Sequence, residues 1–150
     1  MRRKEKEITK KEEIEKILRQ SHVCRLAMVD GDKPYLVPMN FGYSNGCLFF
    51  HCAKEGRKID LIKKNPNICF ELDELIRFKK ANMACDWGLE FKSVIGSGKA
   101  QFLEDSKEKK NALNIIMSHY SDRSFEYPDE MLEKTHVIKV VIDEITGKQS

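Results

Sequence analysis

Two turn signals constrain the fold of this chain more than any other feature of its sequence. The dipeptides Asp30-Gly31 and Asn45-Gly46 each follow a run rich in apolar residues, and both are typical of two-residue hairpin loops. This spacing predicts three consecutive antiparallel strands between residues 23 and 53. Parallel strands need long crossover connections, for which turns this short leave no room, so the sequence disfavours a doubly wound parallel sheet.

The rest of the chain alternates helical and extended patterns. Thr9 and Glu12 have the spacing of a capping box and predict a helix over residues 9–20. Asp105 and Glu108 have the same spacing and predict another helix. The other expected elements are a helix within residues 55–66, strands over 67–78, 87–104 and 136–148, and one helical turn after Tyr127-Pro128.

Six or more mostly antiparallel strands of modest length favour a mainly β (α+β) fold, in which a closed barrel is flanked by helices. Closure is favoured because it removes exposed strand edges, and an open α+β sheet is the alternative. Gly96 and Gly98 lie inside a strand pattern and indicate bends or bulges. We expect a single domain over residues 1–150, with residues 1–20 forming a basic N-terminal helix.

Charge and cysteine content exclude several classes of protein. Residues 1–20 hold eight Lys or Arg and five Asp or Glu, which accounts for the whole net charge of +3, so we expect no nucleic-acid surface on the domain. No apolar run approaches the roughly 20 residues of a membrane span. Five cysteines without a CxxC pair indicate reduced thiols, so we expect a cytoplasmic protein with no metal site.

Arg57 and Lys58 follow Gly56 at the predicted start of a helix. The free N–H groups and the dipole of a helix N-terminus favour an anion, and two cations add to that preference. The pattern therefore suggests a phosphate site. The alternative is a solvated basic helix start with no ligand.

Pro38 and His51 each allow two interpretations. Pro38 cannot donate a ladder hydrogen bond, so it either interrupts its strand and frees polar groups of Met39, Asn40 and Phe41 for a ligand, or marks an edge strand or bulge. His51 lies among apolar residues just before the candidate phosphate site. It is either a core residue or a proton donor beside the bound anion.

Three motifs occur in order along the chain. They are V-P-x-N-F-G-Y from Val37, F-H-x-A-x-E-G-R-K from Phe50 and S-V-I-G-x-G from Ser93. In this combination the chain resembles the 5-nitroimidazole-resistance branch of the pyridoxamine 5'-phosphate oxidase-like flavoproteins, over most of residues 1–150. The resemblance implies a split β-barrel that binds FMN and forms a homodimer, with the flavin at the subunit interface.

The resemblance also implies roles for individual residues. Arg57 and Lys58 match the pair that holds the FMN phosphate, and Phe50 and His51 match positions beside the flavin. The segment Cys85-Asp86-Trp87 is expected to form a wall of the partner's site. The strand expected to line the isoalloxazine ring is Val37, Pro38, Met39, Asn40 and Phe41, and a second flavin-contacting strand contributes Ser93 and Val94.

The activity implied by the resemblance is reduction of a small electron-poor molecule, such as a nitroaromatic, by reduced FMN. His51 would orient or protonate the acceptor. Flavin reduction would need a donor such as NAD(P)H, for which the sequence shows no dedicated motif. The C-terminal arginine- and tryptophan-bearing segment of true pyridoxamine-phosphate oxidases is missing, so we do not expect vitamin B6 oxidation. The alternatives are a non-enzymatic flavin carrier or redox sensor, and a split-barrel protein that binds haem or a deazaflavin.

Overall fold

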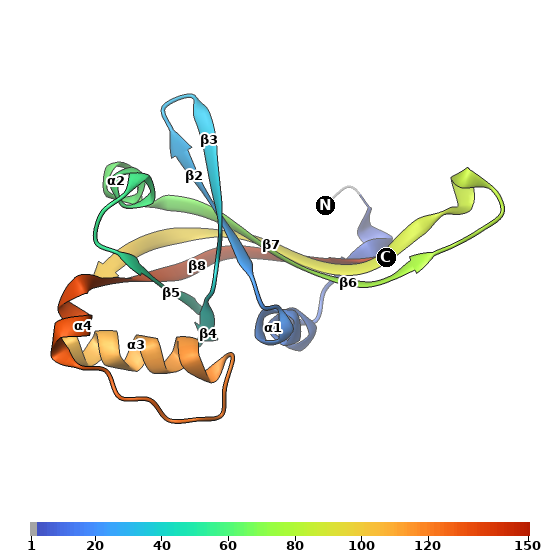
Figure 1. Cartoon of the computed structure of the whole chain (residues 1–150). Helices are drawn as coiled ribbons and strands as arrows, with labels where there is room; N and C mark the ends of the chain where they lie inside the picture. The colour runs from blue at the N-terminus through green and yellow to red at the C-terminus, as the bar shows by residue number, and fades with distance from the viewer. Residues whose placement is uncertain (1–2) are drawn as a thin grey trace.

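The computed structural model describes residues 3–150 and contains one antiparallel sheet of eight strands (Figure 1). Seven strands follow the order β3-β2-β6-β7-β8-β5-β4, and β1 pairs with β8. The strands are β1 Glu7–Ile8, β2 Cys24–Asp30, β3 Lys33–Met39, β4 Gly42–Ser44, β5 Cys47–Ala53, β6 Asn67–Lys79, β7 Gly88–Leu103 and β8 Thr135–Gln149. The α-helices are α1 Lys11–Gln20, α2 Arg57–Lys64, α3 Ser106–Ser118 and α4 Asp129–Lys134, and short 3-10 helices span Lys4–Lys6 and Ala84–Asp86.

Both predicted hairpins are confirmed. Asp30 pairs with Lys33 across the first turn, and Ser44 pairs with Cys47 across the second. Asn45 has a φ of 49° and Gly46 a φ of 73°, the left-handed pair that a tight hairpin turn requires. The loop sequences therefore determine how β2 pairs with β3 and how β4 pairs with β5. The expectation of three consecutive strands is wrong, because the segment between the two turns forms two strands, β3 and β4, at opposite edges of the sheet.

The sheet forms a split barrel, as the resemblance implies, and not the fully closed barrel that the strand pattern favours. Its path ends at β3 on one side and at β4 on the other, and within residues 3–150 no ladder joins these two strands. The chain passes from one edge to the other through Asn40 and Phe41. The split is therefore lined by the V-P-x-N-F-G-Y motif.

Two apolar clusters cover the faces of the sheet. The larger lies on the inner side and packs under α1 and α2, and the smaller lies between the sheet and helices α3 and α4. Figure 1 shows α2 beside the β2–β3 hairpin, and α3 and α4 together on the opposite side. The largest fully buried side chains are Phe41, Phe50, Phe70, Leu18, Leu26, Leu48, Ile59, Leu72, Ile116 and Ile138.

The two predicted capping boxes have different outcomes. Asp105 caps α3, because its Oδ1 accepts a hydrogen bond of 2.9 Å from the backbone N–H of Glu108. The prediction of a capping box at Thr9 is wrong. Helix α1 begins at Lys11, and its N-cap residue, Lys10, makes no side-chain cap bond. Pairing of the preceding residues with β8 as strand β1 keeps the chain extended up to the helix.

Strands β6 and β7 continue beyond the rest of the sheet as a two-stranded arm, which extends to the right in Figure 1. A β-bulge between Leu75 and Arg77 shifts the register within the arm. A second bulge lies between Ser97 and Gly98, where β7 pairs with β8, and confirms the irregularity predicted from the glycines. Among the described residues, no helix is both long and apolar enough to cross a membrane.

Candidate functional site

The N-terminus of α2 presents unpaired backbone donors. Gly56 precedes the helix with a φ of 129° and a ψ of 162°, a conformation that essentially only glycine adopts. The N–H groups of Ile59 and Asp60 donate to the carbonyl of Gly56. Within residues 3–150, no acceptor is found for the N–H groups of Arg57 and Lys58, so both are available to an anion.

The guanidinium of Arg57 is held against the β2–β3 hairpin. Its Nε and Nη2 donate to Oδ2 of Asp30 at 3.0 Å and 2.6 Å. Its Cζ lies 4.7 Å from the centre of the Tyr35 ring, in a cation–π contact. Arg57 thus connects α2 to both strands of the hairpin.

The side chain of Lys58 joins α2 to the V-P-x-N-F-G-Y strand. Its Nζ donates to Sδ of Met39 at 3.4 Å. Met39 is the last residue of β3, at the edge of the split. The structure therefore places two predicted site segments, Val37 to Phe41 and Arg57-Lys58, next to each other.

The residues of the ring-lining segment alternate in burial. Val37 and Met39 pack against the inner core, Pro38 and Asn40 are exposed, and Phe41 is fully buried. Because side chains alternate across a strand, a ligand at this edge meets either the Val37–Met39 side or the Pro38–Asn40 side.

Pro38 does not interrupt its strand, so that interpretation is wrong. The ladder with β2 continues through the Arg25–Pro38 pair to the Cys24–Met39 pair. It tolerates proline because β3 is an edge strand, and a missing N–H on the free side costs no ladder bond. The chain leaves the sheet after Met39, later than predicted.

The end of α3 fixes the backbone at the split. The N–H of Phe41 donates to the hydroxyl of Tyr120 at 3.0 Å, and that hydroxyl donates to the carbonyl of His22 at 2.8 Å. The Nε2 of His119 lies 2.6 Å from the carbonyl of Ser21, and the His119 and Phe41 ring centres are 4.5 Å apart. Burial raises the pKa of Tyr120 and lowers that of His119.

His51 is exposed, so its interpretation as a core residue is wrong. Its neighbour Phe50 is fully buried, and adjacent residues of a strand point to opposite faces. The side chains of Phe50 and His51 therefore do not lie together, although the motif places them side by side. Phe50 can only present its backbone to a ligand outside the core.

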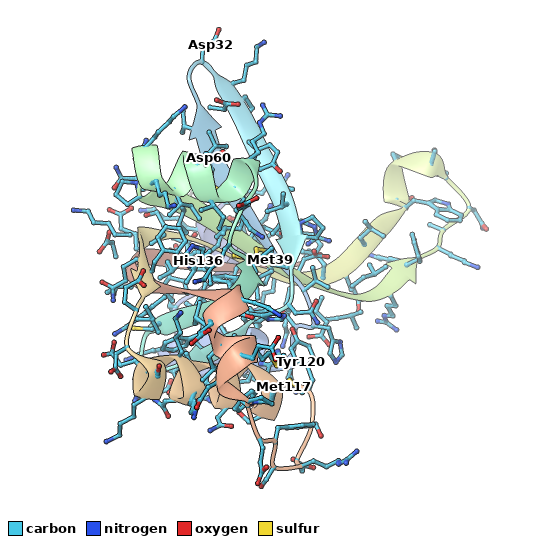
Figure 2. The ribbon with its side chains drawn as sticks, turned by 60° about the vertical axis from the view of Figure 1, so that its left-hand side comes forward. Asp32, Met39, Asp60, Met117, Tyr120 and His136 are labelled. Atoms are coloured by element: carbon cyan, nitrogen blue, oxygen red, sulfur yellow. The ribbon has the colours of Figure 1, made fainter. Side chains whose placement is uncertain are left out.

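A cysteine on β5 and a histidine on the neighbouring strand β8 lie side by side, and sequence reasoning assigned neither to the site. Cys52 is half-buried and pairs in register with His136. Burial raises the pKa of Cys52, and the nearby charge of Lys58 opposes this rise. Figure 2 shows Met39 and His136 near the helix that carries Asp60, which is α2.

His136 has no polar partner for one ring nitrogen. Its Nδ1 is buried and makes no hydrogen bond to the described residues, and its ring lies 4.8 Å from that of Phe102. Burial lowers its pKa. Only the pairing of β5 with β8 brings His136 to this side, and no spacing along the sequence indicates that.

Ser93 and Val94 lie away from Arg57 and Lys58. Val94 is fully buried in the core, and Ser93 pairs with Asp73, whose carboxylate accepts a hydrogen bond from Arg25. Arg25 is five residues before Asp30 on β2, about 17 Å along the strand. Cys85, Asp86 and Trp87 are farther away still, exposed at the tip of the arm.

Comparison with known proteins identifies the family. The family model described as pyridoxamine 5'-phosphate oxidase matches residues 10–149. This chain belongs to the pyridoxamine 5'-phosphate oxidase-like family. The resemblance predicted from the three motifs is therefore confirmed at the family level.

Two solved structures are similar to this chain. A crystal structure of a candidate 5-nitroimidazole antibiotic resistance protein from Bacteroides thetaiotaomicron VPI-5482 is 38% identical, with a TM-score of 0.86 over 95% of this chain and 85% of that chain. The FAD and heme binding protein from Mycobacterium smegmatis is 16% identical, with a TM-score of 0.89 over 97% of this chain and 73% of that chain, and shares the fold.

One curated protein is similar to part of this chain. An uncharacterized protein of Rhizobium meliloti (strain 1021) is 26% identical over 96 residues, which is 64% of this chain. The match covers 56% of that protein, so the chain spans a little over half the length of this relative.

Proposed function

We propose that this chain binds FMN and acts as a flavin-dependent reductase of small electron-poor molecules. The observation that carries the proposal is the 3.4 Å contact between Nζ of Lys58 and Sδ of Met39. It brings the candidate phosphate-binding residues to the edge of the strand that the family resemblance assigns to the flavin ring. The likeness to the nitroimidazole-resistance protein of B. thetaiotaomicron supports a nitroaromatic acceptor.

The N-terminus of α2 suits the phosphate of FMN. Arg57 and Lys58 provide two positive charges, and their backbone N–H groups add two uncharged donors. Such a set of donors favours a doubly charged phosphate ester over a neutral group. No side chain crowds the turn, since a Cβ built on Gly56 would have no atom within 4 Å.

The split edge provides a surface for the flavin ring. Val37 and Met39 offer half-buried apolar side chains there. On the opposite side lie Pro38 and, directly after β3, Asn40. The free edge of β3 presents backbone groups that no ladder within residues 3–150 uses. A planar ring with polar atoms at its margin can pack on the side chains of Val37 and Met39 and form hydrogen bonds with the free backbone groups of β3.

When bound, a flavin supplies two-electron transfer between a donor and an acceptor, and the protein supplies position and electrostatics. We propose NAD(P)H as the donor. His51 is exposed at the end of β5, and its imidazole would orient the acceptor or give it a proton.

We further propose a homodimer in which each flavin lies between two chains. Arg57 and His51 are exposed, and Lys58 is half-buried. The candidate site is thus open to solvent, and a second chain would cover it. The exposed arm with its tip residues Cys85-Asp86-Trp87 supplies surface for such a contact.

The binding test uses FMN and a variant without both cations. We expect Arg57→Ala with Lys58→Ala to lower FMN affinity at least about a hundredfold, measured from the flavin absorbance that is retained with the protein. The control is Lys63→Ala with Lys64→Ala, at the other end of α2. Full FMN occupancy in the first variant would contradict the phosphate assignment, and preferential binding of haem or a deazaflavin would support those alternatives instead.

The activity test is anaerobic. NAD(P)H should bleach the bound flavin, and a nitroimidazole should restore its colour, with His51→Ala retaining flavin but turning over at least about tenfold more slowly. Bleaching without reoxidation would favour a flavin carrier or redox sensor. Unchanged turnover in His51→Ala would remove His51 from the mechanism.

A further inference from the structure

Asp30 makes a contact that the proposed phosphate site does not by itself require. It is the last residue of β2, and its carboxylate accepts two hydrogen bonds from Arg57, the residue proposed to hold the phosphate. The side chains of Arg57 and Asp30 are 56% and 35% exposed, so their ion pair contributes little to folding stability. The geometry of this ion pair therefore says more about its role than its strength does.

Both hydrogen bonds use the same side of the guanidinium. Oδ2 of Asp30 binds Nε and one Nη2 hydrogen, which leaves three of the five N–H donors of Arg57 directed away from the carboxylate. The Tyr35 ring covers one face of the guanidinium at 4.7 Å. Arg57 is thereby restrained on one edge and one face, with its Nη1 edge open.

We propose that Asp30 is a positioning residue for phosphate recognition, assisted by Tyr35. Its carboxylate fixes Arg57 so that the open Nη1 edge meets the phosphoryl group of FMN. This inference rests on the proposed FMN site. Ordering a flexible arginine costs conformational entropy on binding, and a side chain already restrained in the free protein avoids most of that cost.

The negative charge of Asp30 also acts on the ligand directly. A carboxylate near a phosphate repels it, and this repulsion falls with distance. Asp30 bonds the Nε–Nη2 edge of the guanidinium, and the phosphate is assigned to the edge that carries Nη1, so the two anions use different edges of one cation. We therefore expect Asp30 to strengthen phosphate binding rather than weaken it.

The experiment compares FMN with riboflavin, which has the same ring and no phosphate. Asp30→Asn should weaken FMN binding about tenfold and leave riboflavin binding unchanged, measured by quenching of flavin fluorescence. Tyr35→Leu should weaken FMN binding in the same direction by a smaller factor. Asp32→Asn is the control, because Asp32 lies in the same hairpin turn, exposed at its tip (Figure 2).

A double-mutant cycle tests whether Asp30 acts through Arg57. In an Arg57→Ala background, Asp30→Asn should have no further effect on FMN affinity. Tighter FMN binding by Asp30→Asn would show that the carboxylate competes with phosphate, and an equal loss of riboflavin binding would show a general structural role. Either result overturns the proposal, as does an unchanged FMN affinity.

The two proposals fail in different ways. A wild-type chain that binds neither FMN nor riboflavin would overturn the proposed function and this inference together. A wild-type chain that binds FMN, combined with an Asp30→Asn variant of equal affinity, would overturn only the role of Asp30.

Discussion

The split in the barrel is held by a few polar contacts from single residues. Tyr120 accepts from the N–H of Phe41 and donates to the carbonyl of His22, so one hydroxyl joins three segments of the chain. His119 packs on Phe41 and lies within hydrogen-bond distance of the carbonyl of Ser21. Because a carbonyl only accepts, the Nε2 of His119 must carry the proton, which fixes the tautomer of the neutral ring.

We expect folding stability to fall as the pH decreases from about 7.5 to 5.5. Burial lowers the pKa of His119 in the folded chain, so the unfolded chain binds the proton first. The contribution is fully present above the ordinary histidine pKa and is lost as the pH falls toward the lowered value. Urea unfolding at both pH values measures it.

The variant His119→Gln should show a smaller difference in unfolding free energy between the two pH values. Exposed His51→Gln serves as its control, because His51 does not contribute to the lowered pKa of His119. His136 also has a lowered pKa, so part of the pH dependence should persist in His119→Gln. An unchanged pH dependence would show that His119 does not contribute.

At the residue scale, the sequence predicts the positively charged site residues but not the side chains that contact them. Arg57 and Lys58 follow from a glycine, a helix start and a family motif. Asp30 and Tyr35 belong to a hairpin that only the folded sheet brings to α2, so nothing near Arg57 in the sequence indicates them. The opposite faces of Phe50 and His51, by contrast, follow from the alternation of side chains along a strand, a rule that needs only the sequence of β5.

Secondary-structure elements were predictable where a local signal acts alone. Turn dipeptides define the β2–β3 and β4–β5 hairpins, and Asp105 caps α3. The start of α1 was not predictable, because the pairing of β1 with β8 joins residues at opposite ends of the chain. The bulge at Gly98 was predictable in part, because the glycine indicates its position along β7 but not that β8 is the partner strand.

Gly98→Ala should destabilise the fold by about 2 kcal/mol or more. A Cβ at this position would lie 2.1 Å from the carbonyl oxygen of Val141, a backbone atom that cannot move without disturbing the β7–β8 ladder. Thermal or urea unfolding measures the change.

Gly88→Ala is the matched control on the same strand, because a Cβ there would meet nothing within 4 Å. We expect its unfolding free energy to stay close to that of the wild type. Equal stability of the two variants would mean that the bulge adapts to a side chain.

At the scale of the whole molecule, the arm formed by β6 and β7 has two unlike faces. The bulge after Leu75 brings Leu75 and Phe78 to the same face as Leu89 and Phe91, with which they pair. The other face carries the ion pair of Arg77 and Glu90, with hydrogen bonds of 2.6 Å and 2.8 Å. An exposed apolar face on an isolated two-stranded ribbon is typical of an interaction surface. The sequence pattern alone did not reveal this face, because the bulge interrupts the alternation of apolar and polar residues along β6.

We expect Phe78→Ser with Leu89→Ser to raise the dissociation constant of the proposed homodimer at least about tenfold. These side chains are 59% and 47% exposed, so their replacement should not unfold the chain. Light scattering during gel filtration over a range of concentrations measures the dimer.

The control is Arg77→Ser with Glu90→Ser, on the polar face of the same arm. Equal weakening by the two double variants would contradict a specific role for the apolar face. A wild-type chain that is monomeric at all concentrations would contradict the homodimer itself.

The two prolines of β3 determine what kind of partner the open edge of the barrel can accept. Pro34 and Pro38 pair with Val29 and Arg25, four positions apart, and therefore share one side of the strand. A strand from another molecule would need an N–H donor at each of these positions and would find none. A small planar molecule needs only one or two bonds and can use the groups between them. The edge is thus closed to polymerisation by strand addition while it stays open to a ligand.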